Sequence, residues 1–475
     1  MEMLIDGNWV GADEEIDVEN PATGEVLDRM PVASEAQVTE AIAVAQRGRA
    51  EMAALPAHER ARMLFAVADQ LASRQEELAR MLAAENGKPI RQTREEVGAA
   101  ARIFRGFGEE SKRIFGRQIP LDAVPGLERH FAVTVREPLG VVATIIPFNY
   151  PVELYAHKAA AALAAGNAVI VKPPEKCPLT LLEVGRIVKD AGVPTAGHQV
   201  VCGAAETAQR LAGADGVDLI SLTGGTEVGR RLAELAAGTL KQVHLELGAN
   251  DVMIVCEDAD VELATEAVVL GRLARGNGQI CCAVKRVFVA DPLYDEFAHG
   301  LEREARKLVV GDQMSEETDV GPLINEAAAE AVAAAIAETE RAGATIALGG
   351  GREGAFIDPT VITEVPAGAA AIEREVFGPV APLMRAKSPE DGVAVANASR
   401  QGLQASVFTR DIERAFSLAN RLQVGGVVIN GSGALRAENM PFGGVKETGS
   451  GREGLHDTLE AMTAQKAIVV MNARR

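Results

Sequence analysis

Two adjacent cysteines in a glycine-rich turn are the residues of this sequence best suited to covalent chemistry. Cys281 and Cys282 lie in GNGQICCAVKRVFV, residues 276–289, which ends in an apolar run that predicts a strand. Gly276 and Gly278 allow positive φ, so the turn can present a thiol and its own N–H to a bound carbonyl. Free cysteines are more often small buried hydrophobic residues, so this interpretation depends on what else the chain supplies.

Two further stretches predict a nucleotide site, although the chain has no GxGxxG fingerprint. In LTGGTEVG, residues 222–229, a predicted strand stops at two glycines and a helix starts at Thr226, where free backbone N–H groups can hold a pyrophosphate. In VKPPE, Lys172 and Glu175 follow another predicted strand. A carboxylate there can accept both hydroxyls of an adenosine ribose and repels a 2′-phosphate. The alternative interpretation of LTGGTEVG is a tight turn, and that of VKPPE is a solvated charged loop.

The composition is that of a globular protein with several domains. The chain has 475 residues, 47% hydrophobic and 24% charged, so we expect two or three domains with substantial cores. Its 48 basic and 67 acidic side chains give a net charge of −19, which argues against a general role on nucleic acid or anionic membranes. The first residues show no secretory signal, and no apolar run is long enough to cross a bilayer. Five cysteines without framework spacing fit a reducing compartment, so we expect a cytoplasmic protein.

The elements that must position these residues alternate along the chain. Apolar residues recur at three and four over residues 34–115, which predicts helices, and 128–136 alternates like a half-exposed strand. From 138 to 249, predicted strands and helices follow one another. This alternation is typical of a doubly wound parallel sheet, which binds ligands beyond the carboxyl ends of its strands. The second half repeats the pattern more loosely, with an alanine-rich helix over 326–342 and a last strand at 466–471.

Taken together and in this order, these stretches resemble the aldehyde dehydrogenase superfamily over essentially the whole chain. The family's cysteine motif, GQ-any-C, matches Gly278 to Cys281, which implies that Cys281 and not Cys282 is the nucleophile. Its glutamate motif matches LELGAN with Glu246, and its asparagine motif matches PFNYP with Asn149. The resemblance implies that Cys281 attacks an aldehyde while the Asn149 amide and the Cys281 N–H hold the alkoxide. Hydride then passes to NAD, and Glu246 activates the water that hydrolyses the thioester.

The resemblance also implies an NAD site, with NADP as the alternative cofactor, and no metal. It implies Lys172 and Glu175 at the adenosine ribose. It further implies Gly225 and Thr226 at the pyrophosphate, and Glu375 and Phe377 at the nicotinamide half. Many members have a serine where this chain has Gly225, so only backbone contacts to the pyrophosphate are implied there.

Cationic side chains at the positions of the family's substrate tunnel predict an anionic substrate. In relatives that take apolar aldehydes, apolar or aromatic residues line this tunnel, and the PFGG loop that contains Phe442 closes it. The same offsets in this chain hold Arg275, Arg436 and His157, with Arg105 near a further position. Each arginine is equally explained as a salt-bridged surface residue. Their convergence in an acidic protein predicts a small aldehyde with a carboxylate, phosphonate, phosphate or sulfonate, as in the lactaldehyde and semialdehyde branches of the family.

The implied architecture has three parts. The fold class is α/β, with a Rossmann-like NAD-binding domain over 1–121 and 141–247 and an α/β catalytic domain over 248–440. Segments 122–140 and 441–475 form a small β oligomerisation domain and the tunnel loop. We expect a homodimer or homotetramer in which a partner subunit completes the protruding strands, because an open strand edge in water is a liability.

Two other functions remain compatible with parts of the pattern. A cysteine hydrolase without a redox role needs only Cys281 and Glu246, and a catalytically silent relative keeps only the fold. Relatives that pass the acyl group to coenzyme A tend to lack the glutamate, so Glu246 favours hydrolysis. The joint presence of Cys281, Glu246 and Asn149 favours an NAD-dependent dehydrogenase of a small anionic aldehyde.

Overall fold

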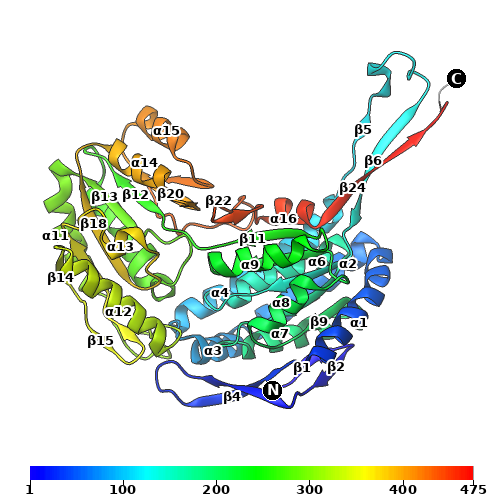
Figure 1. The fold of residues 1–475 in the computed structure, drawn as a ribbon, viewed down its shortest axis with the longest axis horizontal. Helices are drawn as coiled ribbons and strands as arrows, with labels where there is room; N and C mark the ends of the chain where they lie inside the picture. Colours follow the sequence, from blue (N-terminus) through cyan, green and yellow to red (C-terminus); the bar gives the residue numbers. More distant parts are fainter. Residues whose placement is uncertain (474–475) are drawn as a thin grey trace.

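Two sheets covered by helices form two lobes, and a thin β arm projects from one of them (Figure 1). The computed structural model describes residues 1–473. Among these residues no helix is both long and apolar enough to cross a membrane. The predicted α/β class, with a parallel sheet in each half of the chain, is confirmed.

The first sheet is doubly wound. Its order is β2-β1-β9-β8-β7-β10-β11-β23, and the strands from β9 to β11 are all parallel. The chain reverses its direction of winding between β7 and β10, so a crevice opens at the carboxyl ends of these two strands. The strands are β1 (Met3–Ile5), β2 (Asn8–Val10), β7 (Val141–Ile145), β8 (Ala168–Lys172), β9 (His198–Val200), β10 (Leu219–Thr223), β11 (Gln242–Glu246) and β23 (Gly449–Ser450).

Helices bury both faces of this sheet, and so β7, β8 and β10 are apolar runs without alternation. The helices predicted over 34–115 are α1 (Glu35–Ala54), α2 (Ala57–Ser73), α3 (Gln75–Asn86) and α4 (Ile90–Glu110). The crossover helices are α5 (Pro151–Tyr155), α6 (Ala161–Ala165), α7 (Leu179–Asp190), α8 (Ala205–Gly213) and α9 (Thr226–Ala237). A π-helical turn, Ala156–Ala160, joins α5 to α6, and such turns are frequent at functional sites.

The second sheet repeats this winding. Its order is β14-β17-β18-β13-β12-β20-β21, and only β14 is antiparallel to its neighbour. The strands are β12 (Val252–Val255), β13 (Arg286–Ala290), β14 (Thr345–Leu348), β17 (Thr360–Thr363), β18 (Val380–Ala386), β20 (Gln404–Phe408) and β21 (Gly426–Ile429). Its helices are α10 (Val261–Val268), α11 (Tyr294–Ala305), α12 (Glu326–Arg341), α13 (Ala370–Glu373), α14 (Pro389–Ala398) and α15 (Ile412–Arg421). Because β11 passes directly through residues 247–251 into β12, the carboxyl edge of the first sheet faces the amino edge of the second.

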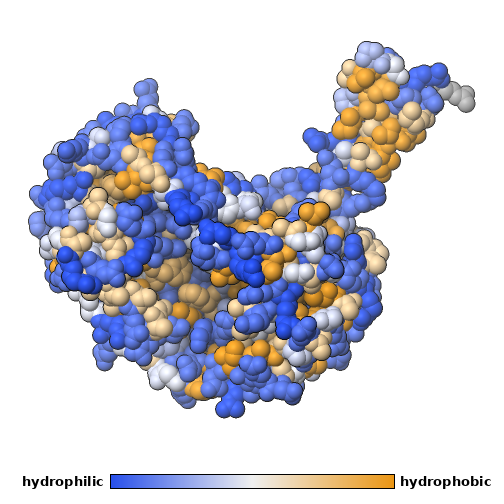
Figure 2. Space-filling view, in the orientation of Figure 1, coloured by the Kyte–Doolittle hydropathy of each residue, from blue (hydrophilic) through white to orange (hydrophobic). Residues whose placement is uncertain are grey.

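The arm is a three-stranded antiparallel sheet of order β24-β6-β5. It consists of β5 (Gln118–Ile119), β6 (Phe131–Pro138) and β24 (Thr463–Val470), with β24 paired to β6 along its whole length. Apolar side chains cover much of its surface (Figure 2). The smaller ribbons are β3 (Glu14–Glu19) with β4 (Val26–Val32), β15 (Arg352–Glu353) with β16 (Phe356–Ile357), and β19 (Gln401–Gly402) with β22 (Val445–Lys446). Helix α16 (Leu455–Ala461) precedes the arm's last strand.

Candidate active site

The turn that presents Cys281 is built from three consecutive residues with positive φ. Gly276, Asn277 and Gly278 have φ of 57°, 54° and 73°. A Cβ added at Gly278 would lie 2.3 Å from the carbonyl carbon of Gly378, so only glycine fits there. The Asn277 amide donates to the carbonyls of Gly87 and Pro322 at 3.0 and 2.8 Å, which fixes the turn between the two lobes. The predicted role of the two glycines is confirmed, and Asn277 is a third member that the sequence did not single out.

Cys281 is the one cysteine of the five that is partly exposed, and Cys282 behind it is buried. A hydrogen bond with Cys282 and burial raise the pKa of the Cys281 thiol, whereas the charges of Lys285 and Arg436 act in the opposite direction. The sulfur is therefore a thiol in the resting protein. Attack on a carbonyl requires a base that takes its proton.

Glu246 is one of three glutamates that line the same pocket as Cys281. It ends β11, is 4% exposed, and neither carboxylate oxygen has a hydrogen-bond partner among residues 1–473. Burial and the negative charge of Glu453 raise the pKa of Glu246 well above its usual value. A carboxyl group with a raised pKa is suited to general acid and base work.

Asn149 lies where the thiol pocket meets the crevice of the first sheet. One N–H of its side-chain amide donates to the Gln279 carbonyl at 3.0 Å, which leaves the other free for an oxyanion. Its backbone carbonyl accepts from the buried Lys88 ammonium at 2.7 Å. These contacts hold the amide in place before any substrate arrives, as an oxyanion hole requires.

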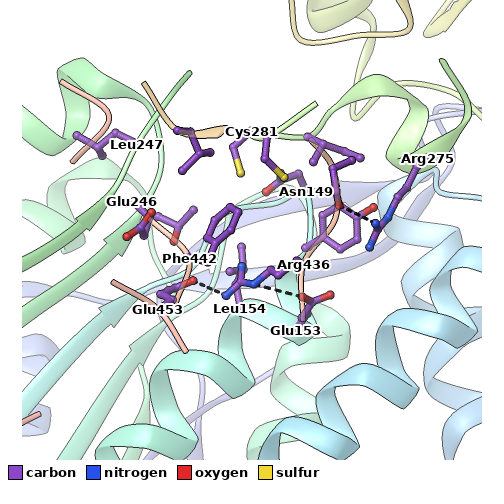
Figure 3. Close-up of a pocket in the computed structure, with 16 residues that line it drawn as sticks. Asn149, Glu153, Leu154, Glu246, Leu247, Arg275, Cys281, Arg436, Phe442 and Glu453 are labelled. Carbon is purple, nitrogen blue, oxygen red and sulfur yellow. Dashed lines mark hydrogen bonds and ion pairs between the residues drawn. The ribbon is translucent and has the colours of Figure 1, made fainter. Parts of the chain in front are cut away.

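A buried ion network lies behind the pocket (Figure 3). Glu453 accepts from Lys158 at 2.5 Å and from Arg436 at 2.7 Å. Although burial raises it, these two cations hold the pKa of Glu453 well below its usual value. The sequence did not identify Lys158 or Glu453 as site residues, because 295 positions separate them and neither belongs to a motif. The network leaves Glu453 ionised beside Glu246.

The crevice at the switch point of the first sheet is a cavity of about 470 Å³ that also reaches Cys281. It brings together five of the six predicted cofactor residues: Lys172, Glu175, Gly225, Glu375 and Phe377. The Thr226 hydroxyl instead accepts from the Gln401 amide at 3.4 Å.

The charges and openings of this cavity suit a dinucleotide. Lys172 pairs with Glu175 at 2.9 Å, and Lys285 pairs with Glu375 at 3.0 Å. A Cβ added at Gly225 would meet nothing within 4 Å, so the start of α9 is open to a phosphate. The residues present therefore fit NAD or NADP. The described residues contain no cluster of three or more His, Cys, Asp or Glu side chains that could hold a metal ion.

The substrate side of Cys281 consists of two compartments. The inner compartment, about 40 Å³, is lined by Glu246, Arg436 and Phe442 among others, and the outer compartment measures about 220 Å³. Tyr150, Glu153 and Arg275 line both. Three of the predicted substrate residues, Arg275, Arg436 and Phe442, thus meet at the thiol.

Arg436 and Arg275 have different electrostatic surroundings. Arg436 binds Glu453, and its guanidinium lies 4.5 Å from the ring centre of Phe442. Arg275 donates to the Ala434 carbonyl at 2.9 Å, and no carboxylate of the described residues lies within 4.0 Å of it. Arg436 is therefore largely neutralised, whereas Arg275 is a cation without a counter-ion.

Two predicted substrate residues do not reach the pocket. Arg105 is half exposed and pairs with Asp69 on the outside of α4. Arg102, one turn earlier, lies at the outer compartment and pairs with Glu438 at 2.8 Å. His157 is buried behind the pocket, and burial together with the charge of Arg436 lowers its pKa well below the usual value, so its imidazole is neutral.

Comparison with known proteins identifies the family of the chain. The sequence profile described as "Aldehyde dehydrogenase family" matches residues 9–468. The chain belongs to the aldehyde dehydrogenase family. It is 38% identical over 469 residues to 3-sulfolactaldehyde dehydrogenase of Priestia aryabhattai, which covers 98% of this chain and 97% of that protein. It is 34% identical over 475 residues to lactaldehyde dehydrogenase of Methanococcus vannielii, covering 99% and 100%.

Among solved structures, the chain is similar to NADP-dependent glyceraldehyde-3-phosphate dehydrogenase from Bacillus halodurans C-125 in complex with NADP. The TM-score is 0.97 at 36% identity, and 99% of each chain is covered. The predicted enzyme class, an NAD(P)-dependent oxidoreductase that acts on small aldehydes, is confirmed. Neither the redox-free hydrolase nor the silent relative is favoured.

Proposed function

We propose that this aldehyde dehydrogenase oxidises a small aldehyde that carries an anionic group, with NAD as cofactor. The observation that supports the anionic group is Arg275, a cation without a carboxylate partner beside the thiol pocket. Arg275 is exposed at the mouth of the pocket, so water solvates its charge until the anionic end of a substrate pairs with it. The inner compartment of about 40 Å³ has room for roughly three water-sized groups, which favours a short aldehyde.

The chain's own residues account for the chemistry. Cys281 loses its proton to solvent water and adds as the thiolate to the aldehyde carbon, while its own N–H and the free N–H of Asn149 donate to the oxyanion. Glu175 and Glu375 line the cavity that would hold NAD, which when bound would accept the hydride. Glu246 in its ionised form then takes a proton from the water that attacks the thioester and passes it to the departing Cys281 sulfur, so the acid and the free thiol are released.

Glu175 favours NAD over NADP. Its carboxylate lines the cofactor cavity beside Lys172 and would repel a 2′-phosphate. The Lys172 ammonium is already engaged by Glu175 and offers a phosphate less charge than a free lysine does. A higher kcat/KM with NADP than with NAD would refute this choice.

The test of the proposed function is a panel of aldehydes assayed with NAD. Succinate semialdehyde and phosphonoacetaldehyde are expected to give kcat/KM values at least about tenfold above that of propanal, because only they reach Arg275 with a charge. NADH formation with propanal but no gain for the anionic aldehydes would leave the reaction class in place and overturn the substrate class.

The arm supports an oligomer, either a dimer or a tetramer. Phe115, Ile468, Val469, Val470 and Met471 expose between 43% and 73% of their surface on it. Strand β24 is an edge strand of the arm and β21 an edge strand of the second sheet, so each has unpaired backbone groups that a second copy can satisfy. The domain boundaries stay a proposal: an NAD-binding domain over 1–121 and 141–247, a catalytic domain over 248–440, and oligomerisation segments over 122–140 and 441–475. Five free thiols fit the proposed cytoplasmic location.

A further inference from the structure

Lys285 is a buried cation beside the proposed nucleophile that the chemistry described above does not use. It directly precedes β13 and is 1% exposed. Its ammonium donates to the backbone carbonyl of Cys281 and pairs with the Glu375 carboxylate at 3.0 Å. Because a buried ammonium is costly unless it is paired and hydrogen-bonded, these two contacts determine where its charge lies.

These two contacts of Lys285 join the nucleophile to the cofactor cavity. Cys281 and Glu375 both line this cavity, and the buried Lys285 bridges them. The Oε1 atom of Glu375 faces Lys285 and is shielded from solvent, whereas the glutamate side chain as a whole is 23% exposed. The carboxylate can therefore accept hydrogen bonds from a ligand in the cavity while it stays next to Lys285.

The charge of Lys285 acts on the Cys281 thiol. A hydrogen bond with Cys282 and burial raise the pKa of this thiol, and Lys285 opposes the rise. The paired carboxylate of Glu375 partly cancels the field of Lys285 at the sulfur. Burial raises the pKa of Asp251, which Lys285 also influences, to about 7, so Asp251 is only a partial counter-ion near neutral pH. Hydrogen-bond donors that bind Glu375 draw its negative charge away from Lys285, and so leave more of the positive field at the sulfur.

From these contacts we propose that Lys285 is a positioning residue that couples the binding of a ribose at Glu375 to the reactivity of the Cys281 thiol. The proposal rests on the proposed function, in which Cys281 is the nucleophile and Glu375 contacts the nicotinamide ribose. Ribose hydroxyls donate to Glu375 and weaken its hold on Lys285, and the ammonium then stabilises the Cys281 thiolate more strongly. The thiol proton passes to solvent water. Without a ribose at Glu375, the protein keeps a less reactive thiol.

The test measures how fast iodoacetamide alkylates Cys281 at fixed pH, followed by peptide mass spectrometry, with saturating ADP or ADP-ribose. Below the pKa of the thiol, this rate follows the fraction of thiolate. ADP-ribose carries the second ribose that ADP lacks, and neither compound has the charged nicotinamide ring. The wild type is expected to react about tenfold faster with ADP-ribose than with ADP, which corresponds to about one unit of thiol pKa.

Variants of Lys285 separate its charge from its hydrogen bond. Lys285→Met should react at nearly equal rates with ADP and ADP-ribose, and comparing this ratio with that of the wild type cancels any steric effect of the second ribose. Lys285→Gln, which still donates but carries no charge, should behave like Lys285→Met, whereas Lys285→Arg should restore most of the wild-type ratio. Lys307→Met is the matched control, since Lys307 is 66% exposed and pairs with Glu304, and it should keep the full ratio.

Steady-state kinetics distinguish positioning from a merely structural role. Lys285→Gln should lower kcat about tenfold and change the KM for NAD less than about threefold, because the cofactor cavity stays intact. A rise in this KM as large as the fall in kcat overturns the coupling. So do equal alkylation rates with ADP and ADP-ribose in the wild type, or a tenfold ratio that persists in both Lys285→Met and Lys285→Gln. If complete alkylation of Cys281 leaves NADH formation intact, the proposed function fails instead.

Discussion

At the scale of single residues, Arg275 and Arg436 share one pocket but are expected to respond differently to removal. An attraction of about 4 kcal/mol at ~4 Å in an effective dielectric of ~20, less desolvation, leaves roughly 2 kcal/mol for an anion at Arg275. Arg275→Leu should therefore lower kcat/KM for succinate semialdehyde about 30-fold and leave propanal unchanged.

Arg436→Leu should reduce kcat/KM for both aldehydes, because it removes a counter-ion of the buried Glu453 next to Glu246. Arg105→Leu is the matched control, since that guanidinium lies on the outside of α4 with Asp69. Equal losses on charged and neutral aldehydes in Arg275→Leu would contradict the assignment of the anion site.

The pKa of Glu246 predicts the pH dependence of turnover. The carboxyl group can activate water only when it is ionised, and burial together with Glu453 raises its pKa well above the usual value. Steady-state kcat should therefore rise with pH until Glu246 is ionised. The raised pKa places this rise at a higher pH than an ordinary glutamate would. Glu453→Gln removes the neighbouring negative charge and should shift this rise to lower pH. A pH–rate profile of NADH formation measures both, and a wild-type profile that falls over the same range would contradict the role of Glu246.

At the scale of elements, the turn that holds Cys281 depends on Gly278. Its φ of 73° and the 2.3 Å approach of a Cβ to Gly378 both exclude a side chain. Gly278→Ala should lower the free energy of unfolding by about 2 kcal/mol or more and reduce the NADH burst by displacing Cys281. Gly213→Ala at the end of α8, where an added Cβ meets nothing within 4 Å, should change neither quantity. Denaturant unfolding and rapid mixing provide the comparison.

The sequence predicted the elements of the first lobe well because both faces of its sheet are buried. Strands such as β7 and β8 are mostly apolar runs without alternation, and glycines mark the turn that follows β10. The sequence predicted less well which side chains of a helix face the pocket. Arg102 and Arg105 are three residues apart on α4, which rotates them about 60° relative to each other. That rotation is enough to put one at the pocket mouth and the other against Asp69.

The sequence also could not show which charges neutralise one another. The partner of Arg436 is Glu453, in the glycine-rich loop, and a second carboxylate, Glu153, lies 3.9 Å away on α5. Only the packing of the loop against α5 reveals that Arg436 is compensated and Arg275 is not. Cys281, Asn149 and Glu246 line one pocket, because each lies at or near the end or start of a buried strand.

At the scale of the whole molecule, the arm predicts assembly. Ile468 and Val470 are 43% and 47% exposed and lie on one face of β24. Wild type is expected to sediment as a dimer or tetramer at micromolar concentration, and Ile468→Asp with Val470→Asp should dissociate it, because charges in a buried strand contact are costly. Val26→Asp, an exposed position on the β3–β4 ribbon, serves as the control. A stable wild-type monomer in sedimentation velocity would refute the assembly.

The thiol of Cys281 lies between the two lobes, next to the cofactor cavity and the substrate pocket. The first turnover tests the roles of Cys281 and Glu246 most directly. Rapid mixing of enzyme and NAD with succinate semialdehyde measures hydride transfer before thioester hydrolysis. Glu246→Gln should release about one NADH per active site in a burst and then turn over about 10²-fold or more slowly than wild type, while Cys281→Ala should show neither burst nor turnover. Steady-state NADH formation by Cys281→Ala at the wild-type rate, or an unchanged steady-state rate in Glu246→Gln, would contradict the account.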